Sequence, residues 1–150
     1  MTAAGKKRVL FVCIGNACRS QMAEGFARAY GSDVIVPASV GVAPWVMVAR
    51  DSIRAMDEKN VDLRRHFPKA LRHLESTDFD LIVNMTGSLL PSEFKGRVID
   101  WKIADPFTME YKEHCEIRDL IESRVMKLIL DLRTTGQAHL RVEGSERPTT

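Results

Sequence analysis

The sequence predicts an α/β fold, a single three-layer domain in which a four-stranded parallel sheet is flanked by helices. Short apolar runs typical of buried strands alternate along the chain with segments of helical periodicity. The chain has 150 residues, which is an ordinary length for one domain. Hydrophobic residues make up 45% and charged residues 28%, a composition typical of globular proteins.

Each element follows from its own pattern. The expected strands share short apolar runs, and they lie at residues 8–13, 34–36, 80–85 and 98–101. The expected helices share apolar residues at three- and four-residue spacing, and they lie at residues 20–30, 49–59 and 113–133. Gly31 ends the first helix, and Pro106 interrupts the chain before the last one.

Composition excludes several classes of protein. Twenty-two Lys and Arg against 20 Asp and Glu give a net charge of +2, which argues against nucleic-acid and polybasic membrane binding. Three cysteines are a poor disulfide framework and fit a reducing compartment, so we expect a cytoplasmic protein. We expect a domain over residues 8–137, a flexible N-terminus at 1–7 without a signal sequence, and a flexible polar tail at 138–150.

The segment that joins the first strand to the first helix is the candidate site. The strand delivers Cys13 to its carboxyl end, where ligands bind in parallel sheets, and the helix begins just after Arg19. Gly15 gives the turn backbone freedom, so its N–H groups can form an anion-binding nest at a helix N-terminus. The guanidinium of Arg19 suits two oxygens of a tetrahedral oxyanion. The same positive surroundings favour a nucleophilic thiolate at Cys13.

Residues 9–20, with the sequence VLFVCIGNACRS, resemble the low-molecular-weight protein tyrosine phosphatase family, whose fold is shared with thioredoxin-coupled arsenate reductases. The resemblance continues at residues 39–41, 80–85 and 105–107, and residues 21–25 are more similar to the reductases. It implies the phosphatase type of fold and a metal-independent phosphotyrosine phosphatase without a cofactor. The substrate would be a phosphotyrosine protein or a small aryl phosphate, and phosphate, sulfate or arsenate would bind as oxyanions.

The resemblance also implies roles for individual residues. Cys13 would be the nucleophile that forms a cysteinyl phosphate, Arg19 would hold the equatorial oxygens, and Asp105 would be the general acid and then the general base. The oxyanion-binding loop shares backbone N–H groups and would consist of Ile14, Gly15, Asn16, Ala17, Cys18 and Ser20. Asn16 would also brace the loop, and Ser20 would hydrogen-bond to the thiolate.

The resemblance also implies positions in the site for three further side chains. Trp45 and Phe107 would form two aromatic walls over the cradle, which suits a flat phenyl phosphate. Trp45 alone is equally consistent with a cap on the core. The family has a histidine that hydrogen-bonds to the loop asparagine, and His66 fills this place with a shift of one residue.

Two alternatives to the phosphatase stay open. An arsenate reductase of the thioredoxin-coupled type needs two further cysteines at and after the end of the third strand, and residues 84–93 have none. An external thiol, Cys18 or Cys115 would have to replace them. A non-catalytic oxyanion or phosphotyrosine binder would need neither Cys13 nor Asp105. Cys18 is either a packed loop residue or a disulfide partner of Cys13 under oxidation, and His114 with Cys115 is interpreted as incidental.

Overall fold

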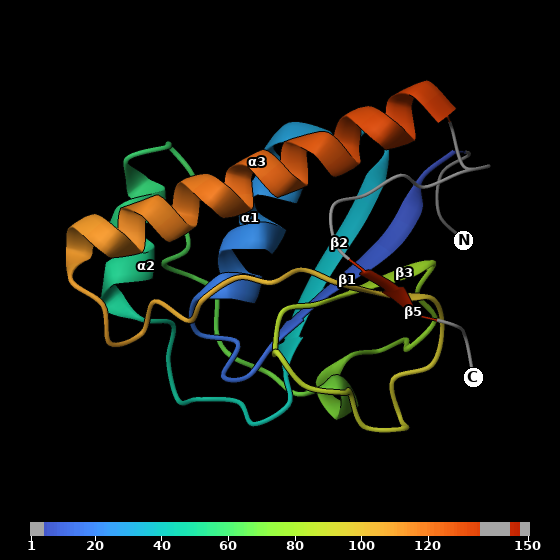
Figure 1. The fold of residues 1–150 in the computed structure, drawn as a ribbon, viewed down its shortest axis with the longest axis horizontal. Coiled ribbons are helices and arrows are strands. Elements are labelled where there is room, and N and C mark those ends of the chain that lie inside the picture. Colours follow the sequence, from blue (N-terminus) through green and yellow to red (C-terminus); the bar gives the residue numbers. More distant parts are fainter. Residues whose placement is uncertain (1–4, 136–144, 148–150) are drawn as a thin grey trace.

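The computed structural model describes residues 5–135 and 145–147 (Figure 1). The elements follow one another as β1 (Lys7–Cys13), α1 (Arg19–Gly31), β2 (Ile35–Gly41), α2 (Arg50–Asp57), the 3-10 helix η1 (Leu71–His73), β3 (Leu81–Asn84), β4 (Val98–Asp100), α3 (Tyr111–Thr135) and β5 (Ser145–Arg147). Strands and helices therefore alternate as the sequence predicts, and the α/β class is confirmed.

The strands form one sheet in the order β2-β1-β3-β4-β5. The four strands from β1 to β4 are parallel, as expected, and β5 pairs antiparallel with β4. The sequence does not predict β5, because its three residues lie in the polar segment that we expected to be a flexible tail. The rest of that tail, apart from 145–147, and residues 1–4 lie outside the described residues.

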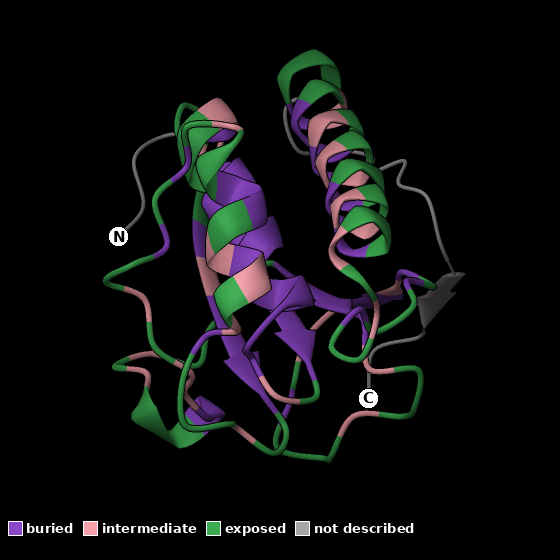
Figure 2. Ribbon diagram, turned by 90° about the vertical axis from the view of Figure 1, so that its left-hand side faces the viewer, coloured by how far each residue is buried: buried purple, intermediate pink, exposed green. Residues whose placement is uncertain are grey.

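The two faces of the sheet are covered by different kinds of structure (Figure 2). Side chains that alternate along β1, such as Val9 and Phe11, pack in a core with residues from α1, α2 and α3. Their neighbours Leu10 and Val12 face a smaller core with Leu71 of η1 and with irregular segments. The three α-helices thus lie on one face, and the third layer consists of η1 and loops instead of the helices that we expected on both sides.

The second strand is longer than predicted. The sequence predicts a strand over residues 34–36, but the strand runs from Ile35 to Gly41 and includes Pro37. β2 is an edge strand, so the missing N–H of Pro37 breaks no ladder between two strands. The extension matters for function, because Gly41 pairs with Cys13 at the carboxyl end of β1.

No described helix is both long and apolar enough to cross a membrane.

Candidate active site

The loop between β1 and α1 turns its peptide N–H groups toward a common centre. The segment after β2 donates hydrogen bonds of 2.8–3.1 Å to four loop carbonyls, in the pairs Val42 N–Cys13 O, Ala43 N–Ile14 O, Trp45 N–Gly15 O and Ala49 N–Ala17 O. Because N–H and C=O of a trans peptide point in opposite directions, the N–H groups of residues 14, 15, 16 and 18 face the inside of the loop. Asn16 has a left-handed φ of 52°, and α1 begins at Arg19. The loop is therefore an anion-binding nest at a helix N-terminus.

Cys13 lies at the base of this nest and is 2% exposed. Its Sγ is 2.9 Å from Oγ of Ser20. The Ser20 hydroxyl accepts a hydrogen bond of 2.7 Å from Nδ2 of Asn16, so its own proton is available to the sulfur. An O–H donor in this position is the partner that a nucleophilic thiolate needs.

The side-chain amide of Asn16 is fully used inside the protein. Its Nδ2 donates to Oγ of Ser20 and, at 3.0 Å, to Oγ of Ser39. Its Oδ1 accepts from Nε2 of Gln21 and from the backbone N–H of Lys69, both at 3.0 Å. Ser39 belongs to β2 and Gln21 to α1, so this one buried side chain ties the loop to both elements.

His66 reaches the loop through Gln21. Its Nδ1 is 2.9 Å from Oε1 of Gln21, and burial lowers the pKa of the imidazole. The direct hydrogen bond to Asn16 that the resemblance implies is not formed, because Gln21 and the Lys69 backbone take both places on the Asn16 carbonyl. His66 therefore supports the loop indirectly, through Gln21.

The guanidinium of Arg19 is anchored on one side and open on the other. It is 4% exposed, and Nη1 donates to the carbonyl oxygens of Met85 and Ile103, at 2.5 and 3.1 Å. Its Nε is buried without a hydrogen-bond partner. A buried donor without an acceptor costs on the order of 1–3 kcal/mol, and more where the group is charged. An oxyanion in the nest would satisfy this donor.

Three side chains enclose the space above the nest. Oδ2 of Asp105 is 3.5 Å from Nη2 of Arg19, and its side chain is half exposed. The rings of Trp45 and Phe107 meet edge to face with their centroids 4.4 Å apart. These side chains and the loop line a cavity of about 130 Å³, which has room for a tetrahedral oxyanion. The structure thus brings together Cys13, Arg19, Asp105 and both aromatic walls.

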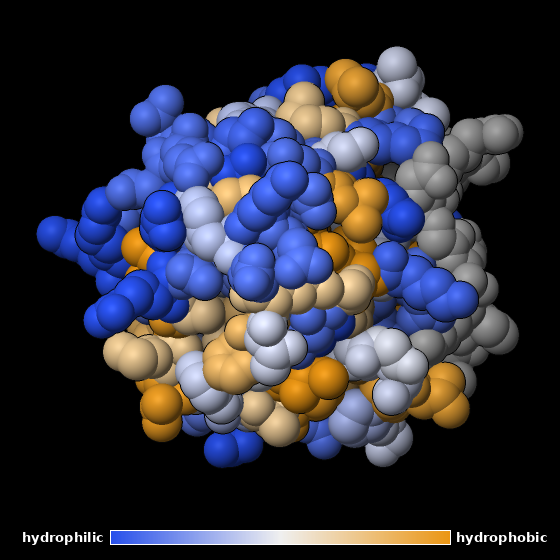
Figure 3. Space-filling view, turned by 60° about the vertical axis from the view of Figure 1, so that its left-hand side comes forward, coloured by the Kyte–Doolittle hydropathy of each residue, from blue (hydrophilic) through white to orange (hydrophobic). Residues whose placement is uncertain are grey.

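The mouth of this cavity is rimmed by apolar side chains. Trp45 and Phe107 are 47% and 45% exposed, so neither is a cap on the core, and Val46 and Met47 beside them are 90% and 63% exposed. In Figure 3, hydrophobic side chains gather on the lower part of the face shown, below the charged surface of the helices. The site therefore opens among apolar groups, and its positive charge is local to Arg19 and the loop.

The other two cysteines differ from each other. Cys18 is 4% exposed and lines the same cavity as Cys13, and burial raises the pKa of its thiol to about 12. Cys115 lies on α3 and does not line that cavity. All three cysteines are free. Among the described residues, no group of three or more His, Cys, Asp or Glu is arranged to hold a metal ion.

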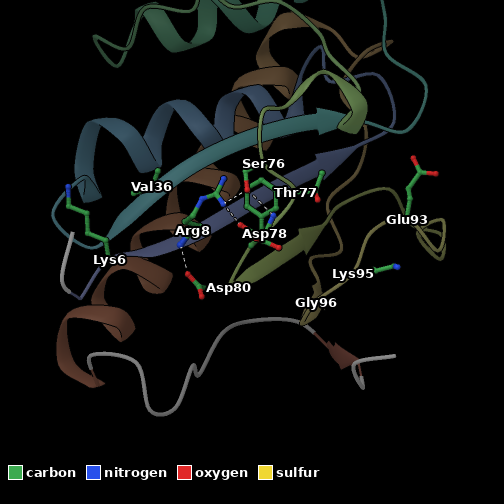
Figure 4. A pocket seen from close by; sticks show the side chains of 11 residues that line it. Lys6, Arg8, Val36, Ser76, Thr77, Asp78, Asp80, Glu93, Lys95 and Gly96 are labelled. Carbon is green, nitrogen blue, oxygen red and sulfur yellow. Dashed lines mark hydrogen bonds between the residues drawn. The ribbon is translucent and has the colours of Figure 1, made fainter. Parts of the chain in front are cut away.

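A larger hollow of about 990 Å³ lies at the opposite end of the sheet (Figure 4). Its lining mixes acidic and basic side chains, and the basic Arg8 is already bound to Ser76 and to the backbone carbonyl of Asp78, with its guanidinium 4.7 Å from the centre of the Phe79 ring. Its lining contains no cysteine and none of the residues predicted for the site. The smaller cavity at Cys13 is therefore the candidate active site.

Several residues that build the site are not predicted from the sequence. Gln21, Ser39 and Lys69 hold Asn16, while Glu24 accepts a 2.5 Å hydrogen bond from Ser39. Helical spacing places Gln21 near the loop, but it does not show which partner the amide takes. Ser39 lies in a segment that carried the resemblance, so a longer predicted second strand would have located it.

Comparisons with known proteins agree with this geometry. Residues 8–138 match the family of low molecular weight phosphotyrosine protein phosphatases. A glutaredoxin arsenate reductase of Synechocystis sp. is 32% identical over 127 residues, which cover 82% of this chain and 96% of that protein. An arsenate reductase of Bacillus cereus is 32% identical over 127 residues, with 81% and 93% covered. A solved arsenate reductase in the phosphate-binding state superposes with a TM-score of 0.74 at 30% identity, covering 83% and 97%.

Proposed function

The chain belongs to the low molecular weight phosphotyrosine protein phosphatase family, and from this premise we propose that it is an arsenate reductase that uses an external thiol donor. The observation that carries the proposal is the cradle itself: a buried thiol lies beneath inward N–H groups and beside an Arg19 Nε that has no acceptor. The names of the relatives favour arsenate over a phosphoryl group as the oxyanion, because similar proteins of about 30% identity are arsenate reductases.

The first step is nucleophilic attack by Cys13. The sulfur bonds to arsenic and an arsenic–oxygen bond breaks, while Arg19 and the loop N–H groups stabilise the charge on the remaining oxygens. Asp105 lies beside Arg19 at the open side of the cavity, where it can hand a proton to the departing oxygen, which leaves as water.

The second step needs another thiol. This thiol attacks the sulfur of Cys13, the sulfur–arsenic bond breaks, and its electron pair stays on arsenic, so arsenic(V) becomes arsenic(III) and leaves as arsenite. Two sulfurs are oxidised to a disulfide. Residues 84–93 contain no cysteine, so the two relay cysteines of the thioredoxin-coupled type are missing there. Cys18, Cys115 or an external thiol would make this attack, and in each case an external thiol donor restores Cys13 and completes the cycle.

A side-by-side assay tests the proposal. We expect arsenate-dependent oxidation of a small thiol or of thioredoxin, supplied separately, with arsenite as the product. Cys13→Ser is expected to abolish it, and Cys115→Ser, which removes a thiol outside the cavity, serves as the matched control. If neither donor is oxidised when arsenate is present, the chain is not an arsenate reductase.

A tyrosine phosphatase is the second candidate, and the edge-to-face pair of Trp45 and Phe107 favours it. Two aromatic walls over a narrow cradle suit a phenyl ring, and a short phosphoserine would not reach Cys13 between them. Hydrolysis needs only Cys13, Arg19, Asp105 and water, so the missing cysteines are no obstacle. Turnover of an aryl phosphate in the same assay, without arsenate-dependent thiol oxidation, would select this function.

A further inference from the structure

The two carbonyls that hold Arg19 come from the ends of two neighbouring strands. Met85 follows the last residue of β3, and Ile103 lies three residues beyond the end of β4. Both carbonyl oxygens accept hydrogen bonds from Nη1 of Arg19. The guanidinium can therefore keep its direction only while these two strand ends keep their positions relative to each other.

One buried side chain joins these strand ends. Asn84 is the last residue of β3 and is 2% exposed. It lies opposite Asp100, the last residue of β4, in the register of the two strands, and its Nδ2 donates to Oδ1 of Asp100 at 2.9 Å. The backbone makes a second link, because the carbonyl oxygen of Asn84 accepts from the N–H of Trp101 at 3.0 Å. Both the side chain and the backbone of Asn84 thus bind the end of β4.

The side-chain amide of Asn84 also closes the turn that carries Met85. Its Nδ2 donates to the carbonyl oxygen of Ser88 at 2.8 Å, and its Oδ1 accepts from the backbone N–H and from Oγ1 of Thr86, at 3.0 and 2.8 Å. Met85 lies inside this turn, and its own N–H donates to the carbonyl oxygen of Val12 on β1 at 2.8 Å. The amide therefore uses both donors and both acceptor positions, and the turn is fixed on either side of Met85.

Asn84 opens the segment in which the thioredoxin-coupled type of reductase needs two cysteines, residues 84–93, and residues 84–88 form the turn that its amide closes. An aspartate could not replace this amide, because a carboxylate has no N–H to donate and would lie beside Asp100. We propose that Asn84 is a positioning residue, which fixes the spacing of the two carbonyls that point Arg19 into the oxyanion nest. The proposal rests on the oxyanion site of the proposed function and deepens it.

Loss of the Asn84 amide would free the two strand ends to move apart. A hydrogen bond weakens steeply when its donor and acceptor lose their alignment, so Nη1 of Arg19 would be held less firmly. The guanidinium would then spend less time in the orientation that suits an oxyanion. Asn84 touches no substrate in this account, and its whole effect on binding passes through Arg19.

Phosphate binding tests this role, because it needs neither a thiol donor nor a leaving group. Protection of Cys13 from alkylation by iodoacetamide, followed by mass spectrometry, measures the affinity for inorganic phosphate even where binding is weak. We expect Asn84→Ala to bind phosphate about tenfold more weakly, the lower end of the loss of a hydrogen bond to a charged group. Asn84→Asp has nearly the same size and should lose at least as much. Tyr30→Phe, which removes a hydrogen bond between α1 and α3, is the matched control and should bind phosphate like the parent.

A double-mutant cycle separates positioning from general damage to the site. In an Arg19→Ala background, Asn84→Ala should change the phosphate affinity by less than about twofold, because the group that it positions is gone. A loss of about tenfold that persists in this background would mean that the loop or the thiol is disturbed directly, and it would overturn the proposal. Parent-like affinity in both Asn84 variants would overturn it as well.

The partner of Asn84 on β4 gives the same test if the Asn84 variants do not unfold cooperatively in urea. Asp100 is less buried, and Asp100→Ala removes the acceptor of the link between the strands. We expect weaker phosphate binding in Asp100→Ala and parent-like binding in Asp100→Asn, because an amide oxygen still accepts from Asn84. Equal losses in the two Asp100 variants would show that the charge matters instead of the link, and would overturn the proposal.

The arsenate assay separates the role of Asn84 from the proposed function. A parent whose phosphate binding depends on Asn84 through Arg19, but which oxidises no thiol with arsenate, keeps this role and loses the reductase. An active reductase in which Asn84→Ala binds phosphate like the parent keeps the reductase and loses the role of Asn84.

Discussion

At the scale of single residues, Arg19 shows how one side chain can be both a structural anchor and a ligand. Nη1 is held by two backbone carbonyls, so the guanidinium is fixed before any oxyanion arrives. Nε is left without a partner. A lysine has a single ammonium group in place of the planar guanidinium. It therefore cannot bind the two backbone carbonyls and an oxyanion at the same time.

Arg19→Lys is therefore expected to weaken phosphate binding by roughly ten- to a hundredfold, since a lost hydrogen bond to a charged group costs about 1.5–3 kcal/mol. Titration calorimetry with inorganic phosphate measures the change. Arg72→Lys on the exposed part of η1 is the matched control and should bind phosphate like the parent. Equal affinity in Arg19→Lys would remove Arg19 from the oxyanion site.

Asp105 is the residue through which the phosphatase function can be tested. Its Oδ1 accepts the backbone N–H of Phe107 at 3.0 Å, and its Oδ2 faces Arg19, so the carboxyl group is held at the mouth of the cavity. We expect Asp105→Asn to slow an aryl phosphate with a poor leaving group far more than one with a good leaving group. Equal losses on the two substrates, measured as kcat/KM, would contradict a general-acid role.

The sequence located the residues of the site that share one loop, because their spacing and order are local. It did not locate contacts between distant segments. His66 was expected to hydrogen-bond to Asn16 and instead bonds to Gln21. Its place in the sequence differs by one residue from that of the family histidine, and such a shift changes which side chain the imidazole reaches. His114 was interpreted as incidental, because Ser52 lies 62 residues away and only the packing of α2 on α3 joins them.

At the scale of secondary-structure elements, the end of β2 supports the loop between β1 and α1 by close contact. A Cβ added to Gly41 would lie 2.6 Å from the carbonyl oxygen of Ile14 and 2.8 Å from the N of Asn16. Both are backbone atoms and cannot move aside alone. The loop can take its shape only if β2 ends in a residue without a side chain.

Gly41→Ala is expected to lower the free energy of unfolding by about 1–3 kcal/mol, as overpacking does, and to weaken phosphate binding because the loop must shift. Gly15→Ala is the matched comparison for stability, because its nearest atom would be Cβ of Trp45 at an ordinary 3.7 Å. Urea unfolding measures both variants. A loss in Gly15→Ala as large as that in Gly41→Ala would contradict this role for the close contact.

Elements were predictable where their apolar pattern was self-contained. The buried run of β1 and the long amphipathic α3 followed directly from the sequence. The prediction for β2 stopped at Val36, where the apolar run ends, since the sequence does not show that the strand lies at an edge where Pro37 is tolerated. In the layer of η1 and loops that covers Leu10 and Val12, apolar residues recur at no regular spacing, and β5 is short and polar. Neither segment therefore has a sequence pattern that predicts it.

At the scale of the whole molecule, the net charge of +2 does not show that some groups have a different pKa in the folded protein than in the unfolded chain. Burial lowers the pKa of His66 and His114 and raises that of Cys18. The unfolded chain therefore binds more protons below pH 6.5 and fewer above pH 9.0 than the folded protein does. Stability should be greatest between these limits and should fall on both sides.

The alkaline side gives the sharper prediction. Unfolded Cys18 loses its proton near 9.0, whereas folded Cys18 keeps it to about 12, so this stabilisation is complete below 9.0 and is lost as pH rises through 12. The loss is at most about 1.4 kcal/mol for each pH unit. Cys18→Ala should abolish this part of the dependence, while Cys115→Ala should keep it. Urea unfolding at a pH below 9.0 and at a pH above it gives the free energy of unfolding of the parent and of the variant. In the difference between the two proteins, the contributions of groups that both contain, such as Lys69, cancel. A Cys18→Ala curve parallel to that of the parent would mean that the Cys18 thiol ionises alike in the folded and unfolded states, and it would contradict this prediction.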